Sequence, residues 1–267
     1  MPGTPEAASG SRSSPGVPAL YLSISSDRRV AGLSAGNEDI IAWHGAAGFS
    51  LYFDGSDVGL SSFAIDAFAI QSPTQILMSF TAAGSIPGIS GTVDDSDIVR
   101  FTAASLGDNT AGSFSLYFDA SDVGLTLADE DVDAIELLPS GAFLLSTTGS
   151  FSVSGLSGSD KDIFACNSPT TGPSSACGSL TPYFVGTAVG LSNTNEDVDG
   201  LAVGGGNIYL STTGGFSVSG LAGSDEDVFI CRSPTTGTNT SCSSFSLFFD
   251  GSVYGLGRND IKASDLP

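Results

Sequence analysis

The sequence feature that most constrains the fold is a short phrase that returns eight times. It begins with Gly-Leu or Gly-Ile, at Gly32, Gly59, Gly88, Gly124, Gly155, Gly190, Gly220 and Gly255. Seven of the eight phrases end in an Asp before Val or Ile, at Asp39, Asp97, Asp131, Asp162, Asp197, Asp227 and Asp260. Two such phrases fall in each period of about 65 residues, so the chain is built from repeats that are each nearly duplicated internally.

Short runs of Val, Ile, Leu, Phe and Tyr lie between the phrases and are bounded by turn residues, which is typical of β-strands. Four runs fill one period, for example 132–138, 143–147, 163–166 and 181–185. The fourth period is divided between the chain ends, because 19–23, 40–43 and 50–53 supply three strands and 261–266 supplies the missing first one. A closed ring accounts for this division, whereas an open solenoid with capping repeats does not.

We therefore predict an all-β protein, a four-bladed β-propeller with four antiparallel strands per blade. Pairing of the N- and C-terminal strands would close it. A frame that begins each blade at the third strand gives the same number of blades. The propeller is expected to form one domain over 19–267, preceded by a flexible leader or linker over 1–18, which is rich in Pro, Gly, Ser and Ala.

The net charge of the chain excludes some classes of binding partner. The formal net charge is −21, with only eight Lys and Arg, so nucleic acid and anionic membrane surfaces would be repelled. No apolar run approaches the length of a membrane-spanning helix, and we expect no membrane insertion. The expected partner is a surface protein or a glycan of unknown identity.

The four cysteines fall in register in two repeats, as Cys166 with Cys177 and Cys231 with Cys242. Equal spacing in equivalent loops predicts two disulfides, and therefore an exported protein that is extracellular or on the cell surface. Unpaired core cysteines are the alternative. A zinc site is disfavoured because the short knuckle spacing is absent.

Two resemblances extend this prediction. Segments 198–203 and 207–210 resemble the first two strands of NHL-type propeller blades. The segments TVDDSDIVRF at 92–101 and FSLYFDASDVGL at 114–125, like YFDGSDVGL at 52–60, resemble a repeat of exported bacterial proteins of unassigned function. The second resemblance covers nearly everything after residue 18. It implies a propeller-like surface protein and brings no known active site.

In a meander of this strand order, all eight phrases lie in loops on one face, which should be acidic, while the opposite face should be nearly uncharged. The repeated Asp could accept backbone N–H bonds as a turn residue. It could instead coordinate a cation, and calcium is the ion that hard oxygen ligands favour. The candidate metal ligands are Asp131, Asp162, Asp197 and Asp227 from the phrases, with Asp66, Asp133 and Asp199 from one position in the first strand of three blades. Lys262 occupies that position in the fourth blade, as a possible internal counter-charge.

The predicted function is a secreted or cell-surface binding or structural module with an acidic face that calcium stabilises. The alternative is an extracytoplasmic hydrolase acting on glycans. It would use the pairs Asp131/Asp133 and Asp197/Asp199, since two nearby carboxylates can serve as acid and base. The pairing is not kept in the other two blades, so we favour a protein that is not an enzyme.

Overall fold

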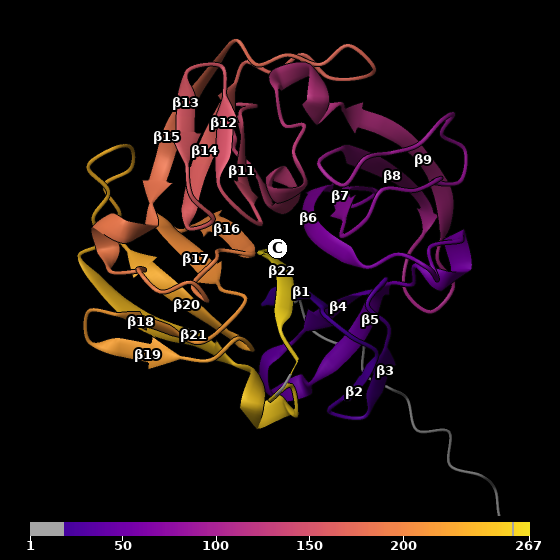
Figure 1. Ribbon diagram of the computed structural model, residues 1–267. Coiled ribbons are helices and arrows are strands. Elements are labelled where there is room, and N and C mark those ends of the chain that lie inside the picture. Colours follow the sequence, from indigo (N-terminus) through magenta and orange to yellow (C-terminus); the bar gives the residue numbers. More distant parts are fainter. Residues whose placement is uncertain (1–18, 258) are drawn as a thin grey trace, which may run out of the picture.

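The computed structural model describes residues 19–257 and 259–267, and the predicted leader at 1–18 lies outside this range. Four sheets of four antiparallel strands are arranged around a common axis (Figure 1). The chain is therefore an all-β, four-bladed β-propeller, as its sequence predicts.

Three blades are made from continuous stretches of chain. The first contains β6 (Ile65–Ser72), β7 (Gln75–Phe80), β8 (Ile98–Ser105) and β9 (Ala111–Phe118). The second contains β10 (Val132–Leu137), β11 (Phe143–Thr147), β14 (Asp162–Asn167) and β15 (Ser179–Val185). The third contains β16 (Gly200–Gly204), β17 (Asn207–Ser211), β20 (Asp227–Arg232) and β21 (Ser244–Asp250). The predicted strands all exist, and most of them are longer than the apolar runs that revealed them.

The fourth blade combines the two ends of the chain, as the divided repeat predicts. Its strands are β22 (Ile261–Asp265), β1 (Leu20–Ile24), β4 (Ile40–Trp43) and β5 (Phe49–Phe53), in that order. β22 pairs with β1 in antiparallel register, with Tyr21 opposite Asp265 and Ser23 opposite Ala263. The first strands of the blades, β6, β10, β16 and β22, lie next to one another around the axis. They are called the inner strands below.

The hydrophobic core lies between blades rather than within them. Each of the four apolar layers joins residues of one blade to residues of the next. A fully buried Phe at the end of each fourth strand repeats around the ring, at Phe53, Phe118, Phe184 and Phe249. Phe118, for example, packs edge-on against Phe143 of the following blade, with ring centroids 4.9 Å apart. The fourth layer, between β21 and the divided blade, contains residues of both β1 and β22.

Seven of the eight phrases form two different structures, which the sequence analysis treats as one, and the phrase at Gly88 lies in an irregular loop between β7 and β8. In three blades the loop after the second strand is a small hairpin: β2 (Arg28–Val30) with β3 (Leu33–Ala35), β12 (Phe151–Val153) with β13 (Leu156–Gly158), and β18 (Phe216–Val218) with β19 (Leu221–Gly223). Ser154 and Gly155 both have positive φ, of 37° and 86°, which the tight turn of such a hairpin requires. The loops between blades instead carry short 3-10 helices, η2 (Ser56–Val58), η3 (Ala120–Val123), η5 (Gly186–Val189) and η6 (Gly251–Tyr254), each ended by the Gly of a phrase.

Both predicted disulfides are present. Cys166 is bonded to Cys177 and Cys231 to Cys242, which leaves none of the four cysteines free. Each bond ties the third strand of a blade to the loop that follows it. Two such bonds are consistent with an exported protein. Within the described residues, no helix is both long and apolar enough to cross a bilayer.

Candidate functional site: a buried carboxyl cluster on the axis

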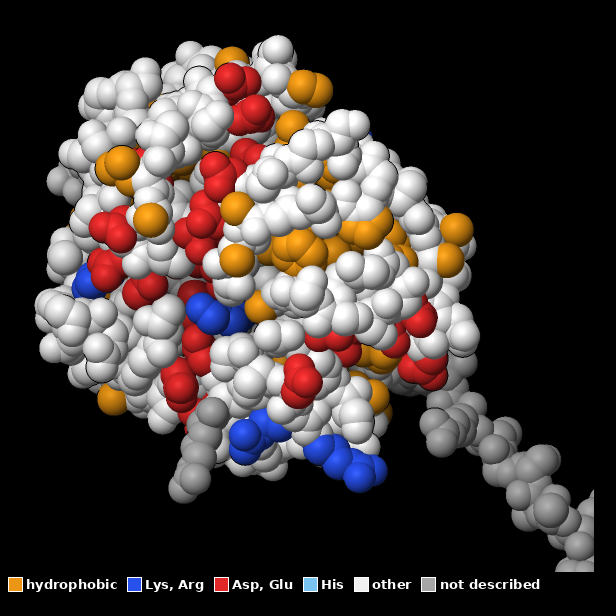
Figure 2. Space-filling model, turned by 45° about the vertical axis from the view of Figure 1, so that its right-hand side comes forward, with side chains coloured by type: hydrophobic (Ala, Val, Ile, Leu, Met, Phe, Trp, Pro, Cys, Tyr) orange, Lys and Arg blue, Asp and Glu red, His pale blue; other side chains and the backbone are white. Residues whose placement is uncertain are grey.

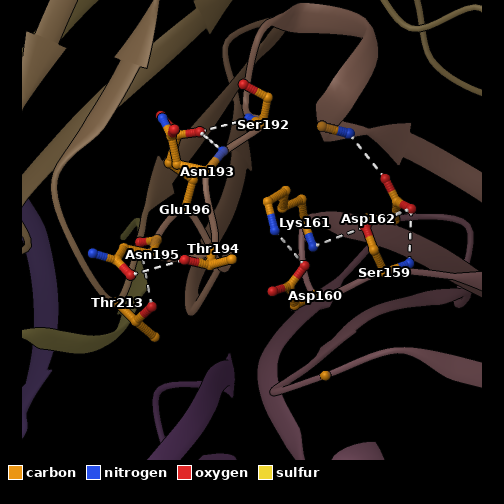
Figure 3. Close-up of polar contacts among 12 residues, drawn as sticks. Ser159, Asp160, Lys161, Asp162, Ser192, Asn193, Thr194, Asn195, Glu196 and Thr213 are labelled. Carbon is orange, nitrogen blue, oxygen red and sulfur yellow. Dashed lines mark hydrogen bonds and ion pairs between the residues drawn. The ribbon is translucent and has the colours of Figure 1, made fainter.

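The repeated Asp residues divide into two groups with different surroundings. The first group stands at or just before the start of the third strand of each blade, at Asp39, Asp97, Asp162 and Asp227. Asp162 accepts a hydrogen bond from the Ser159 N–H at 2.9 Å (Figure 3). It accepts another from the Gly186 N–H at 3.0 Å. Asp227 accepts equivalent bonds from the Ser224 and Gly251 N–H groups. These carboxylates fasten the 3-10 helix of their own blade, which is the turn role considered for them.

Two glutamates of the same phrases are also structural. Glu196 accepts hydrogen bonds from the backbone N–H groups of Ser192 and Asn193 (Figure 3) and from that of Ser217. Glu130 accepts three equivalent bonds. Burial would raise the pKa of each carboxyl group, but these bonds outweigh it and hold the pKa below its usual value. Each glutamate joins the loop between two blades to the small hairpin of the next blade.

The second group of Asp residues meets on the axis, where the inner strands begin. One member of each pair occupies the aligned position of Asp66, Asp133 and Asp199, and the other lies in the segment that leads into the inner strand of the next blade. The resulting carboxyl pairs, each within hydrogen-bonding or close electrostatic reach, are Asp66 with Asp131, Asp133 with Asp197, and Asp199 with Asp260. We call these six residues and Lys262 the axial cluster.

The fourth pair of positions supplies the positive charge that partly compensates the carboxyl groups of the cluster. There the inner strand carries Lys262 and the position that would face it carries Ala64, so an Asp pair is replaced by a single cation. The Lys262 ammonium lies 3.3 Å from Oδ1 of Asp66 and 4.0 Å from Oδ2 of Asp260. One lysine thus faces six carboxyl groups, and the cluster lacks enough positive charge for all of them to be ionised.

Asp133 is the least compensated member of the cluster. Its side chain is 0% exposed, and neither carboxyl oxygen receives a hydrogen bond from any described N–H or O–H donor. Asp199 is equally buried, but one of its oxygens accepts a hydrogen bond from the Ser211 hydroxyl at 2.8 Å. A buried carboxylate without a donor is costly, so Asp133 needs either a proton or a cation.

Burial and mutual repulsion both favour protons in the cluster. Burial raises the pKa of Asp131, Asp197 and Asp199 to about 8. Burial and the charge of Asp199 raise the pKa of Asp260 to about 10, and burial also raises that of Asp133 well above its usual value. Lys262 lowers these values only in part, and its own pKa is raised by the carboxylates around it. A proton shared within each pair would turn two opposed acceptors into a hydrogen bond.

These shifts predict an unusual pH profile. Between pH 4 and about pH 8 the unfolded chain releases protons that the folded cluster retains, so stability falls as pH rises, by about 1.4 kcal/mol per pH unit for each such group. Unfolding by urea in the presence of a chelator should show stability that decreases steadily from pH 5 to pH 8. Asp131→Asn with Asp197→Asn should flatten the profile, and Asp129→Asn, at an exposed position, should not. Stability that rises between pH 5 and pH 8 would contradict the assignment.

The structure brings together five of the seven predicted ligands, Asp66, Asp131, Asp133, Asp197 and Asp199, and places Asp162 and Asp227 in turns away from the axis. Among the described residues, no three Asp, Glu, His or Cys side chains converge closely enough to hold a metal ion. The pairs proposed for hydrolysis, such as Asp131 and Asp133, are 7% and 0% exposed and each partner faces another blade. The cluster also includes Asp260, whose place only the ring closure reveals.

Acidic side chains are also prominent on the outside. Figure 2 shows them gathered in a band through the middle of one face, with few basic side chains beside it. The opposite end of the axis is not free of charge, because Glu136 and Asp265 are buried where the inner strands finish. Neither residue belongs to a repeated phrase, and no sequence signal distinguishes them.

No family model and no curated protein matches the chain. Among solved structures, it is similar to one described as the extracellular domain of a one component system from B. thetaiotaomicron, with 12% identity and a TM-score of 0.34. The match covers 81% of this chain and 32% of that chain, so this chain spans about a third of the other's length.

Proposed function

We propose that this chain is an exported binding or structural module that takes up a cation, calcium, at the axial cluster. The observation that carries the proposal is Asp133, a fully buried carboxyl group whose oxygens accept no hydrogen bond from a described N–H or O–H donor and which lies among five other carboxyl groups and one lysine. The propeller fold and the two disulfides support export and a scaffold role.

The chemistry of the cluster suits calcium, because all of its potential ligands are carboxyl oxygens. Its packing is not that of a tight site, since no three ligating side chains converge. We therefore expect weak binding, in the 10⁻⁴–10⁻³ M range of extracellular modules. Uptake of calcium would compete with protons, because the carboxyl groups must lose them to coordinate the ion.

Millimolar calcium should raise the melting temperature at pH 8 relative to chelator with sodium chloride of equal ionic strength. A site of this affinity stabilises the fold by roughly 1 kcal/mol, which is about 2–4 °C for a domain of this size. The shift should vanish near pH 5, where protons occupy the cluster. Lys262→Ala should enlarge it, and Asp133→Asn with Asp199→Asn should abolish it.

Asp129→Asn is the matched control, because it removes one charge from an exposed side chain in the loop before Asp131. It should leave the calcium effect intact. Identical melting curves in chelator and in calcium at pH 8 would exclude the calcium site. Hydrolysis of any glycan in a substrate screen, if lost in Asp133→Asn, would replace the binding module by the hydrolase alternative.

A further inference from the structure

A cavity of about 500 Å³ lies at the other end of the axis, where the inner strands finish. Its wall includes Glu136 of β10, Val203 and Gly204 of β16, Asp265 of β22 and Ile70 of β6, so all four blades contribute. Glu136 lies three positions after Asp133 along β10, which places the cavity about 10 Å from the axial cluster. The cavity is therefore a separate feature from the proposed calcium site.

Two buried carboxyl groups line this cavity, and each is 7% exposed. Asp265 accepts hydrogen bonds from the N–H groups of Ile70, at 2.6 Å, and Leu266, at 2.7 Å. Glu136 receives one backbone bond, from Val203, which leaves acceptor capacity directed at the cavity. None of the described residues that line the cavity is Lys, Arg or His, so the protein supplies no cation there.

Aromatic rings form one side of the same cavity. Tyr209 and Phe248 both line it, and their rings meet edge to face with centroids 4.9 Å apart. The ring of Trp43 packs edge to face against that of Phe248, with ring centroids 6.2 Å apart. A wall with two carboxyl groups beside an aromatic wall is a combination that attracts organic cations, through the carboxyl groups once they ionise and through the ring faces. Burial raises the pKa of Glu136 to about 9 and that of Asp265 to about 7, so entry of a cation would favour loss of their protons.

We propose that this cavity binds a primary ammonium group carried on an alkyl chain. The ammonium would donate hydrogen bonds to Glu136 and to the free lone pairs of Asp265, and charge-assisted bonds of this kind are the stronger class. The alkyl chain would lie against Tyr209 and Phe248. A quaternary ammonium ion has no N–H donor, so it would leave both buried carboxyl groups without new partners. The ligand could be a free alkylamine or the lysine side chain of a partner protein.

The test is isothermal titration calorimetry of the intact chain at fixed ionic strength with three probes. They are n-pentylammonium, Nα-acetyl-lysine methylamide and tetramethylammonium. We expect saturable binding of one amine probe or both, at one site per chain, and at least tenfold weaker binding of tetramethylammonium. Binding of pentylammonium alone would indicate a free amine as the natural ligand, and tighter binding of the lysine analogue would indicate a partner protein.

Two variants locate the site. Glu136→Gln keeps the shape of the side chain and should weaken amine binding at least tenfold, and Phe248→Leu should weaken it severalfold. Asp129→Asn, outside the cavity, should leave it unchanged, and the melting temperature of each variant establishes that it is folded. The proposal is overturned if neither amine binds at millimolar concentration, if tetramethylammonium binds equally well, or if folded Glu136→Gln binds as the parent does.

Discussion

Removal of residues 261–267 should abolish cooperative folding or lower the melting temperature by well over 10 °C. The deletion takes away the whole of β22, in which Ile261 is 0% and Ala263 is 2% exposed. It also exposes the edge of β1 to pairing with other molecules and removes the cation of the axial cluster. Truncating a buried Ile alone costs about 2–5 kcal/mol. The combined loss approaches the 5–15 kcal/mol that a whole domain typically has.

A synthetic peptide covering 259–267 provides the matching control. Added to the truncated chain, it should restore the cooperative melting transition, because only one strand of an otherwise complete sheet is missing. A peptide in which Asp replaces Ile261 should fail. If the truncated chain stays monomeric and melts at the parent's temperature without any peptide, the ring is not closed by β22.

Lys262→Met should destabilise the protein by about 3–5 kcal/mol at pH 8, because it leaves buried carboxylates without their cation. For a domain of this size the expected fall in melting temperature is about 10 °C. The loss should be smaller at pH 5, where the carboxyl groups with a pKa of about 8 are protonated and need less compensation. Urea unfolding at the two pH values measures both effects.

Lys161→Met serves as the comparison. Lys161 forms an ion pair with Asp160 at 2.6 Å, but Asp160 is partly exposed and water can replace the lysine. Lys161 is itself buried and lies near enough to Asp197 to lower the pKa of that carboxyl group, so its loss has a cost, but one smaller than that of Lys262, which compensates six carboxyl groups. Asp66→Asn in the Lys262→Met background should recover part of the stability, because the closest unpaired carboxylate is then gone. Equal losses for the two lysine substitutions would show that Lys262 does not compensate the cluster.

The fold could be predicted from sequence because the repeats recur with strict spacing and one of them is divided between the chain ends. The order of the strands in each blade and the cysteine pairs follow from that alignment alone. The small hairpins could not be predicted, because the same Gly-Leu phrase forms a hairpin turn after a second strand and ends a 3-10 helix between blades. The two forms of the phrase differ in how deeply the Leu after the Gly is buried. Leu125, after η3, is fully buried, whereas Leu156, in β13, is only partly buried.

The site was only partly predictable for a related reason. Sequence alignment puts Asp131 and Asp133 side by side in one strand, but the structure pairs each of them with a carboxyl group of another blade. Those contacts depend on how far the blades are rotated about the axis, which local spacing does not specify. Glu136 and Asp265 lie in different blades and carry no repeated pattern, so only the closed ring brings them to one cavity.

Closure by β1 and β22 also determines how the molecule would respond to tension. Tyr21 stands opposite Asp265, so the chain enters and leaves the blade at the same end of the strand pair. A force that pulls residues 19 and 267 apart would act along the hydrogen bonds between these antiparallel strands. It would load the bonds one at a time, starting at the Tyr21–Asp265 end, and break them in sequence. The three continuous blades have no strand end under load. Under tension the propeller would therefore yield first at its divided blade, at low force, and its remaining twelve long strands would stay paired.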